Sequence, residues 1–384
     1  MTDPIKRLRG GLKRSQLTAR QIASGLDAPD CTRRRVLEVA EIDPTKLARI
    51  LGNEDRQSPF AMIRTRDFTK RMLEGRDGQL SGIIALGRKH LDLPEEYVGT
   101  RDISETPIGQ DFSLSTPKLR AIATEKELYR LLGGSESAGV ELLLHPVLRL
   151  PIGSRLAYIQ PDVIALAAKG RIHVATVRTF PVVDGSADPK QVSNAINESA
   201  VHVLALQHLA VKHGFPADRI STEVMLVLPT GTTLREPTAL VLPTELALRR
   251  LRRLLSREAE AEQVLASLGD IGSFPAQPTK KTDEATKAEV AASAREVLAQ
   301  IPLRFRDDCV SCPLFRTCRD ELGAQGQTAR LGTAVAESLG TFSTVSAAWA
   351  AANGDTDLPG VDGTLLAEIR RARQLQLRAL PRGA

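Results

Sequence analysis

Apolar positions between residues 116 and 244 follow first a helical and then a strand-like pattern. Residues 116–132 have apolar side chains three and four positions apart, which is typical of one face of a helix. Three apolar or alternating runs follow, separated by Pro-Ile-Gly and Lys-Gly, and predict a meander of three strands at residues 139–150, 155–168 and 171–180. Residues 188–214 predict a long helix, and residues 219–244 supply one or two further strands. This order predicts an α/β fold in which a mixed sheet is flanked by helices.

The segments on either side of this core have helical patterns. The N-terminal region, residues 1–115, predicts helices, one of them capped by Thr18, and then a long connection over residues 79–115. Residues 245–257 predict a helix with five arginines around a leucine stripe, which fits either a nucleic-acid backbone or a solvated face. Residues 272–288 have the composition of a flexible linker, and the tail is Ala-rich and helical. We therefore expect four segments along the chain, residues 1–115, 116–245, 246–325 and 326–384.

The composition indicates a folded protein with a basic bias. The chain has 384 residues, 42% of them hydrophobic, which suffices for one large core or two smaller ones. The formal net charge of +6 favours polyanionic partners, whereas an aromatic content of 3% leaves little material for stacking on single-stranded bases. Apolar stretches stay well short of the roughly 20 residues that a bilayer crossing needs, and the basic start lacks the apolar segment of a signal peptide. We therefore expect a cytoplasmic protein without membrane contact.

Three of the four cysteines lie close together in the segment DDCVSCPLFRTC. Cys309, Cys312 and Cys318 form a C-x2-C-x5-C arrangement, in a chain where cysteine makes up about one residue in a hundred. A C-x2-C turn directs two thiolates to one centre, and both tetrahedral zinc and cubane iron–sulfur centres need four such donors. The nearest histidine in the sequence is His213, which excludes a zinc finger complete in the local sequence. The one remaining thiol, that of Cys31, predicts a four-cysteine centre; the alternative is a local zinc site completed by Asp or water.

The upstream cysteine in a C-x-R-R context, the downstream C-x2-C-x5-C and the mixed sheet between them resemble the iron-staple branch of the RecB-family nucleases. The AddB nuclease domain and the CRISPR adaptation nucleases belong to this family, and the likeness covers residues 17–325. The resemblance implies a restriction-endonuclease-like PD-(D/E)XK fold and a [4Fe-4S] cluster that joins the helical N- and C-terminal regions. The implied cluster ligands are Cys31, Cys309, Cys312 and Cys318, and Zn2+ at the same cysteines is the alternative.

The catalytic positions of the family are only partly matched. In the family an Asp ends one strand, an acid-x-Lys pair lies on the next, and a Gln-x3-Tyr pair lies on the following helix; the two acids hold Mg2+ or Mn2+, and the Lys helps to activate water. The resemblance assigns these positions to Asp162, to Thr176 and Arg178, and to Glu198 and His202. Thr176 brings no charge to a metal, and an arginine can hold a phosphate but cannot serve as a base. Asp162 and Glu198 remain as candidate ligands of Mg2+ or Mn2+.

Arginines near the upstream cysteine are the candidate DNA contacts. These are Arg33, Arg34 and Arg35, which the cluster would hold beside the sheet, and Arg178 is the candidate clamp on a phosphate. From the resemblance we interpret the chain as a DNA-binding iron–sulfur protein with lost or weakened cleavage, an accessory or scaffold in DNA processing or anti-invader defence alongside protein partners. The alternatives are an active Mg2+- or Mn2+-dependent DNA exonuclease and a protein-binding subunit without nucleic-acid contact.

Overall fold

The chain forms two compact units that interleave along the sequence. The computed structural model describes residues 4–379 except positions 27–28, 54–58, 74–81, 105–115, 134–138, 154, 161–162, 169–170, 232–235, 258–262, 264, 270, 280, 307–308, 311 and 355–359. Unit 1 consists of the segments Met1–Ser15, Asp27–Asp55 and Ala261–Ala384. Unit 2 consists of the segments Gln16–Leu26 and Arg56–Glu260. Each unit has its own apolar core, and the predicted α/β class is confirmed.

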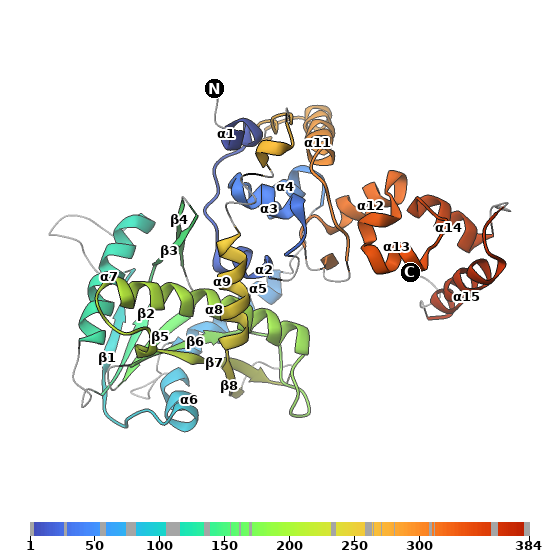
Figure 1. Ribbon diagram of the computed structural model, residues 1–384. Helices are drawn as coiled ribbons and strands as arrows, with labels where there is room; N and C mark the ends of the chain where they lie inside the picture. Colours follow the sequence, from blue (N-terminus) through green and yellow to red (C-terminus); the bar gives the residue numbers. More distant parts are fainter. Residues whose placement is uncertain are drawn as a thin grey trace. The chain divides into compact units, whose positions relative to one another are not determined.

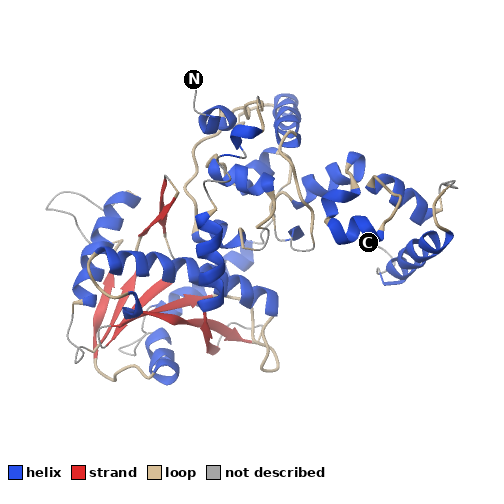
Figure 2. Ribbon diagram, viewed as in Figure 1, coloured by secondary structure: helices blue, strands red, loops and turns tan. Residues whose placement is uncertain are grey.

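Unit 2 is built on a six-stranded mixed sheet (Figure 2). The strand order is β1-β2-β5-β6-β7-β8; β1 is parallel to β2 and β6 to β7, and the other neighbours are antiparallel. The strands of this sheet are β1 (Tyr97–Asp102), β2 (Val140–Leu144), β5 (Val163–Ala168), β6 (Arg171–Val177), β7 (Ile220–Thr230) and β8 (Glu236–Pro243). The remaining strands of the unit, β3 (Leu148–Ile152) and β4 (Arg155–Ile159), form a separate antiparallel hairpin.

Helices cover both faces of this sheet (Figure 1). They are α2 (Ala19–Ser24), α5 (Pro59–Leu73), α6 (Gly82–Leu91), α7 (Pro117–Leu132), α8 (Pro189–Lys212) and α9 (Glu245–Ser256), with a 3₁₀ turn at Ala217–Arg219. Helices α2, α7, α8 and α9 share a core with Val174 and Val224, whereas α5 and α6 share one with Ala175 and Met225. Successive residues of a strand point to opposite faces, so the two groups of helices lie on opposite sides of the sheet. The predicted flanking of a mixed sheet by helices is confirmed.

Local sequence signals set the ends of helices α2 and α8. The Thr18 side chain accepts a hydrogen bond from the Gln21 backbone, and Gln21 bonds back to Thr18, so the predicted cap of α2 is confirmed as a capping box. Helix α8 begins with Pro189 in its first turn, where the missing N–H costs nothing, and Asp188 caps it by accepting from Gln191 N at 2.8 Å. It ends before Gly214, whose φ of +81° suits glycine.

Three predicted regions differ from the structure. The predicted three-strand meander contains five strands, because two of its runs are broken. The first run breaks after β2 at His145 (φ +50°) and Pro146, which has no N–H for a ladder, and the second divides into β4 and β5. The connection expected over residues 79–115 contains α6 and the edge strand β1. In the linker predicted over residues 272–288, positions 272–279 have no regular secondary structure, but a helix begins at Glu284 and Phe274 is fully buried in the core of unit 1. That segment is therefore anchored rather than loose.

Unit 1 is helical. Its elements are α1 (Pro4–Arg9), α3 (Thr32–Val39), α4 (Pro44–Ile50), α11 (Glu284–Ala299), α12 (Phe315–Gln325), a 3₁₀ turn at Thr328–Leu331, α13 (Thr333–Ser338), α14 (Val345–Asn353) and α15 (Gly363–Ala379). Leu8 and Val36 from the first segments pack with Phe274 and Leu298 from the last. Close backbone contact is possible there because Gly10 has no side chain: a Cβ at this position would lie 2.4 Å from Phe274 O.

The last helices form a small cluster of their own. Phe342, Ala348 and Ala351 are buried there, with Leu366 and Ile369 of α15 packed against them. The helical character predicted for the tail is confirmed. Within the described residues, no helix combines the length and the apolar character needed to cross a bilayer.

Candidate functional site

Four cysteines from distant parts of the sequence are gathered in unit 1. Cys31 is the N-cap residue of α3, and Cys318 lies in the first turns of α12, where its N–H donates to Leu314 O at 2.9 Å. Cys309 and Cys312 flank a tight turn, in which Cys312 N donates to Cys309 O at 2.9 Å. The C-x2-C spacing therefore forms the compact turn that the sequence suggests.

The thiols affect one another's ionisation. Burial raises the pKa of Cys312, Arg34 lowers it, and the neighbouring Cys31 and Cys309 raise it again. Burial likewise raises the pKa of Cys318 to about 12, against the effect of Arg33, and Cys312 and Cys31 contribute further increases. Charge effects of this kind weaken with distance, so Cys31 is a neighbour of the cysteines from the C-terminal segment.

Hydrogen-bond donors point at several of these sulfur atoms. Arg306 N donates to Cys309 Sγ at 3.3 Å, and Arg33 Nη1 donates to Cys318 Sγ at 3.4 Å. A backbone hydrogen bond from Leu314 lowers the pKa of Cys312. Such donors favour the thiolate form, which is the form that binds metals. In the part of the chain that the structure describes, however, no three His, Cys, Asp or Glu side chains are arranged to hold a single metal ion.

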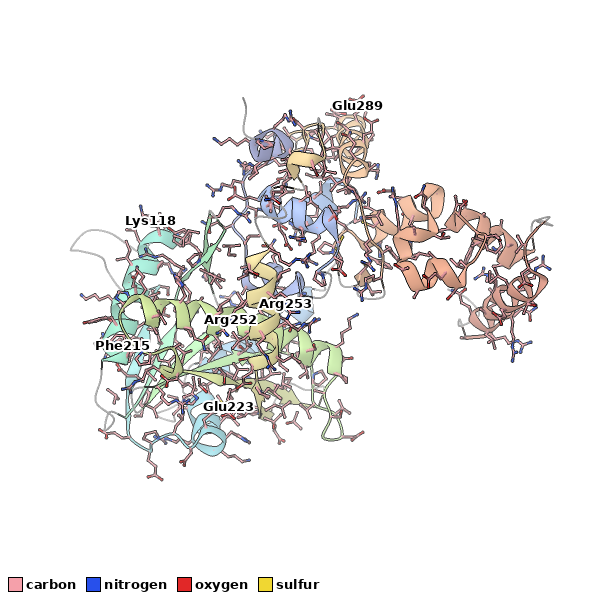
Figure 3. The ribbon with its side chains drawn as sticks, in the orientation of Figure 1. Lys118, Phe215, Glu223, Arg252, Arg253 and Glu289 are labelled. Atoms are coloured by element: carbon pink, nitrogen blue, oxygen red, sulfur yellow. The ribbon has the colours of Figure 1, made fainter. Side chains whose placement is uncertain are left out.

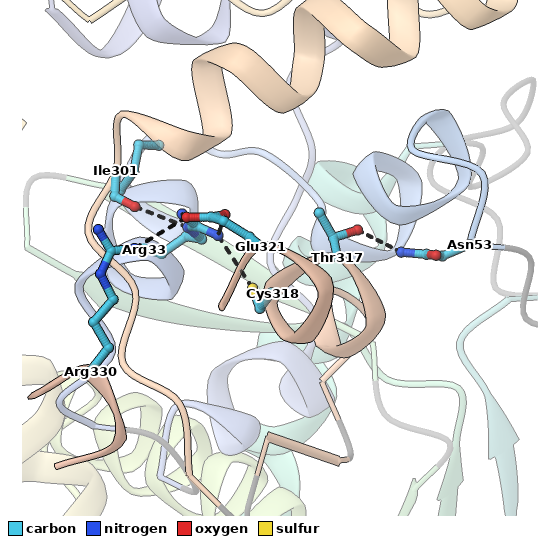
Figure 4. Close-up of polar contacts among 7 residues, drawn as sticks. All are labelled: Arg33, Asn53, Ile301, Thr317, Cys318, Glu321 and Arg330. Atoms are coloured by element: carbon cyan, nitrogen blue, oxygen red, sulfur yellow. Dashed lines mark hydrogen bonds and ion pairs between the residues drawn. The ribbon is translucent and has the colours of Figure 1, made fainter. Parts of the chain in front are cut away.

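Arg33 joins α3 to the cysteine-bearing segment (Figure 4). Its side chain is 1% exposed and makes a bidentate ion pair with Glu321 of α12, at 2.7 and 2.9 Å. Its Nε donates to Ile301 O at 3.0 Å, and Glu321 also accepts from Arg330 at 3.2 Å. Burial alone would lower the pKa of Arg33, but Glu321 and Cys318 raise it above its ordinary value. A charged guanidinium is therefore fixed beside the thiol of Cys318.

Two of the arginines predicted to contact DNA, Arg33 and Arg34, have partners inside the protein. Arg33 is buried as described, and Arg34 is buried with its Nε donating to Glu38 at 2.9 Å. Arg35 is half-buried. Because Arg33 and Arg34 lie beneath the surface of unit 1, they are not presented to a polyanion. Arg33 and Arg34, which the cluster was expected to hold beside the sheet for DNA contact, instead form ion pairs within unit 1.

The described positions assigned by the resemblance lie in unit 2, on α8 and at the end of β6. Thr176 is fully buried, and its hydroxyl shares a hydrogen bond of 3.0 Å with the hydroxyl of Ser199. One residue beyond β6, Arg178 pairs with Glu198 of α8 at 2.6 Å, and the two side chains are 19% and 18% exposed. Asp162 lies outside the described residues; the next residue, Val163, pairs in the sheet with Thr176.

This arrangement offers little to a catalytic metal. Mg2+ and Mn2+ favour oxygen ligands, above all carboxylates. Of the described residues at these positions, Glu198 alone has a carboxylate, and that carboxylate is already paired with Arg178. The hydroxyls of Thr176 and Ser199 satisfy each other. The pair therefore neutralises both the cation expected to hold a phosphate and the acid expected to hold a metal.

His202, four residues after Glu198, lies in the core of unit 2. The side chain is 1% exposed, and neither ring nitrogen has a hydrogen-bond partner among the described residues. Burial, and to a lesser extent Arg178, lower the pKa of His202 to about 3. The histidine is therefore neutral at physiological pH, and protonating it in place would bury an unpaired charge.

Acid is expected to destabilise unit 2 through His202. The unfolded chain, with an ordinary pKa of 6.5, binds a proton more readily than the folded chain, so stability is retained above that value and lost as the pH falls toward 3. The cost by pH 5 is about 2 kcal/mol. Chemical denaturation at about pH 7.5 and about pH 5 measures this loss of unfolding free energy, and His202→Leu is expected to remove the part caused by the histidine. His208→Leu, at an exposed position of α8, serves as the control and should leave the pH dependence of the unfolding free energy unchanged. Equal pH dependence in the wild type and His202→Leu would contradict the assignment.

Sequence reasoning did not single out Glu321 or Ser199. Glu321 follows Cys318 by three positions on α12, a spacing that places both on one face of a helix. That signal was available beside the cysteine motif. Ser199 had no such signal, because its partner Thr176 comes from a strand whose register with α8 is set only by the folded core.

The chain matches no protein-family model and no curated protein.

Proposed function

We propose that the protein binds DNA through a PD-(D/E)XK-like core that has lost cleavage, and that Cys31, Cys309, Cys312 and Cys318 hold a [4Fe-4S] cluster. In this proposal it is a cytoplasmic accessory or scaffold subunit in DNA processing or anti-invader defence, working with protein partners. The observation that carries the proposal is the ion pair between Arg178 and Glu198. It lies where the resembled nucleases have a catalytic lysine and a polar helix residue.

The chain order in unit 2 supports the proposed core. Helix α7 is followed by β2, β5 and β6, which are successive antiparallel neighbours, and then by α8 and β7. The crossover through α8 makes β7 parallel to β6, as a helical connection allows. Helix, three strands, helix and strand is the order that the resemblance implies. The β3–β4 hairpin is an insertion between the first two of these strands.

The register of β5 and β6 supports the assignment of the individual positions. Val163, the first residue of β5, is opposite Thr176, so the start of β5 and the end of β6 belong to the same end of the strand pair. The resemblance places Asp162 and the pair Thr176 and Arg178 at that end. The substitutions found there remove negative charge and a titratable base, which supports binding without hydrolysis.

The nuclease assay separates this proposal from an active exonuclease. With labelled single- and double-stranded DNA and either Mg2+ or Mn2+, we expect no degradation above background for the wild type, for Asp162→Ala or for Glu198→Gln. Without two available carboxylates and a base, the site cannot hold and activate a metal-bound water as these nucleases do. Metal-dependent degradation by the wild type that is lost in Asp162→Ala would overturn the proposed inactivity.

Donor chemistry supports the proposed cluster. Four cysteine thiols, two of which accept hydrogen bonds from N–H groups, suit an iron–sulfur centre. A cubane binds one cysteine per iron, so its four ligands can be spread more widely than those of a single ion. When bound, the cluster would cross-link the second and third segments of unit 1. Anaerobic purification with metal analysis tests this: iron with visible absorption supports the cluster, zinc supports the alternative centre, and neither metal overturns both.

A further inference from the structure

We propose that the outer face of helix α9 binds the phosphate backbone of nucleic acid. The inference rests on the proposed function and deepens it, because it names the surface of unit 2 that meets the polyanion. Helix α9 carries the sequence ELALRRLRRLLS, with Arg257 directly after it. Figure 3 labels Arg252 and Arg253 on this helix.

The two sides of α9 have different roles. One side is apolar: Ala247, Leu248 and Leu251 are buried in the core that α9 shares with α2, α7, α8 and the sheet. The opposite side is solvent-exposed and carries four arginines: Arg249, Arg250, Arg252 and Arg253. At 3.6 residues per turn, Arg249 and Arg253 share one row along the helix, and Arg250 and Arg252 lie on either side of that row.

Arg250 and Arg252, on either side of the row, donate hydrogen bonds to uncharged groups. Arg250 Nη2 donates to Leu26 O at 3.0 Å, and Arg252 Nη2 donates to Gln207 Oε1 at 2.8 Å. These bonds orient the guanidinium groups without cancelling their charge. Within the described part of unit 2, none of the four arginines forms an ion pair with a carboxylate.

The crowding of these charges favours a polyanionic partner. Like charges three and four positions apart on a helix repel each other, so the free protein bears a cost that neutralisation relieves. Glu245, the acid in the first turn, accepts a hydrogen bond from Thr222 and is the sole acidic residue of α9. A row of phosphates would neutralise the arginines and release counterions at each contact. Arginine forks also match phosphate oxygens in pairs.

The same face fits neither a membrane nor a typical protein partner. An interfacial helix inserts its apolar side into lipid, but the apolar side of α9 is already packed in the core. Protein interfaces centre on apolar anchors. Among the described residues of α9, Leu246 is the large apolar side chain left exposed, at 64%, and it lies at the end away from Arg253. A polar, positively charged face of this kind is typical of contacts with nucleic-acid backbone.

Salt-dependent DNA binding by the full chain tests the inference. Fluorescence anisotropy with a labelled double-stranded oligonucleotide gives affinity against salt concentration for the wild type and for Arg249→Gln with Arg253→Gln. We expect the double variant to lose about tenfold in affinity at low salt, and the slope of log K against log salt to fall by about 1.8. Arg249→Lys with Arg253→Lys keeps the charge and is expected to keep the slope. The matched control, Arg64→Gln with Arg66→Gln, removes two exposed arginines from α5 on the other side of the sheet and should change the slope little.

The outcomes separate this inference from the proposed function. A wild type that binds DNA with the same slope as the α9 glutamine variant would overturn the inference and leave DNA binding in place. A wild type that does not bind DNA at low salt would overturn both. Polyglutamate serves as a competitor of the labelled DNA. If it binds the wild type as tightly as DNA does, and if this binding is lost in Arg249→Gln with Arg253→Gln, the assignment to nucleic acid is overturned and an acidic protein is the partner.

Discussion

Replacement of Cys31 by serine is expected to abolish cluster loading and to make unit 1 susceptible to proteases. Cys31 is the one thiol supplied by the early part of the chain, so its loss opens the proposed cross-link to the segment containing Cys309, Cys312 and Cys318. Structural metal bound by thiolates contributes on the order of 10 kcal/mol to folding, comparable with the whole stability of a domain. Iron analysis and limited proteolysis with fragment mapping measure the effect. We expect early cuts in unit 1 and persistence of fragments from the sheet of unit 2.

Two comparisons make that experiment decisive. Cys309→Ser should reproduce the phenotype, because each cysteine would hold a separate corner of one centre. Thr32→Ser changes the neighbouring, partly buried position and should leave iron content and protease resistance unchanged. A Cys31→Ser protein with full iron content and wild-type protease resistance would show that Cys31 is an ordinary partly buried cysteine.

Replacement of Arg33 by methionine is expected to destabilise unit 1 by about 3 kcal/mol. The methionine fills most of the volume but leaves the Glu321 carboxylate without its bidentate partner and Ile301 O without its donor. The Arg330 guanidinium, 3.2 Å from Glu321, keeps the loss from being larger. Denaturant unfolding of the full chain, followed by a probe in unit 1, measures the change.

The partner variant isolates the ion pair. Combining Arg33→Met with Glu321→Leu removes both charges, and the double variant should be more stable than the sum of the single changes predicts. Arg49→Met, at an exposed position of α4, should change stability by no more than about 0.5 kcal/mol. Additive effects of the two changes at Arg33 and Glu321 would show that the contact does not stabilise the fold.

Local sequence patterns predicted the helices and strands better than the contacts that these elements make with one another. The cap at Thr18 and the periodicity of α8 are short-range features, and both predictions are confirmed. The charge of Arg33 suggested a contact with DNA, although its position indicates burial. Arg33 precedes Val36 and Leu37 by three and four residues, which places it on the apolar face of α3. That helical spacing was visible in the sequence and indicates burial.

Other features had no local signal. Strand β1 is largely exposed and lacks strict alternation of apolar residues, so its parallel pairing with β2 depends on contacts that form only in the folded sheet. The ion pair of Arg178 with Glu198 also depends on how α8 lies on β6. The resemblance named both residues but assigned them to a metal and a phosphate, and their mutual neutralisation came from the structure.

The interleaving of the two units imposes an order on synthesis. Residues 56–260 of unit 2 leave the ribosome between the second and third segments of unit 1. At bacterial and eukaryotic elongation rates of about 5–20 residues per second, Leu8 and Val36 wait roughly 10–60 s for Phe274 and Leu298. During that interval α1 and α3 lack these apolar partners, whereas all strands of the sheet have been made before Phe274 is added. The nascent chain is therefore most open to misfolding and chaperone capture near its beginning, even though that part was made first.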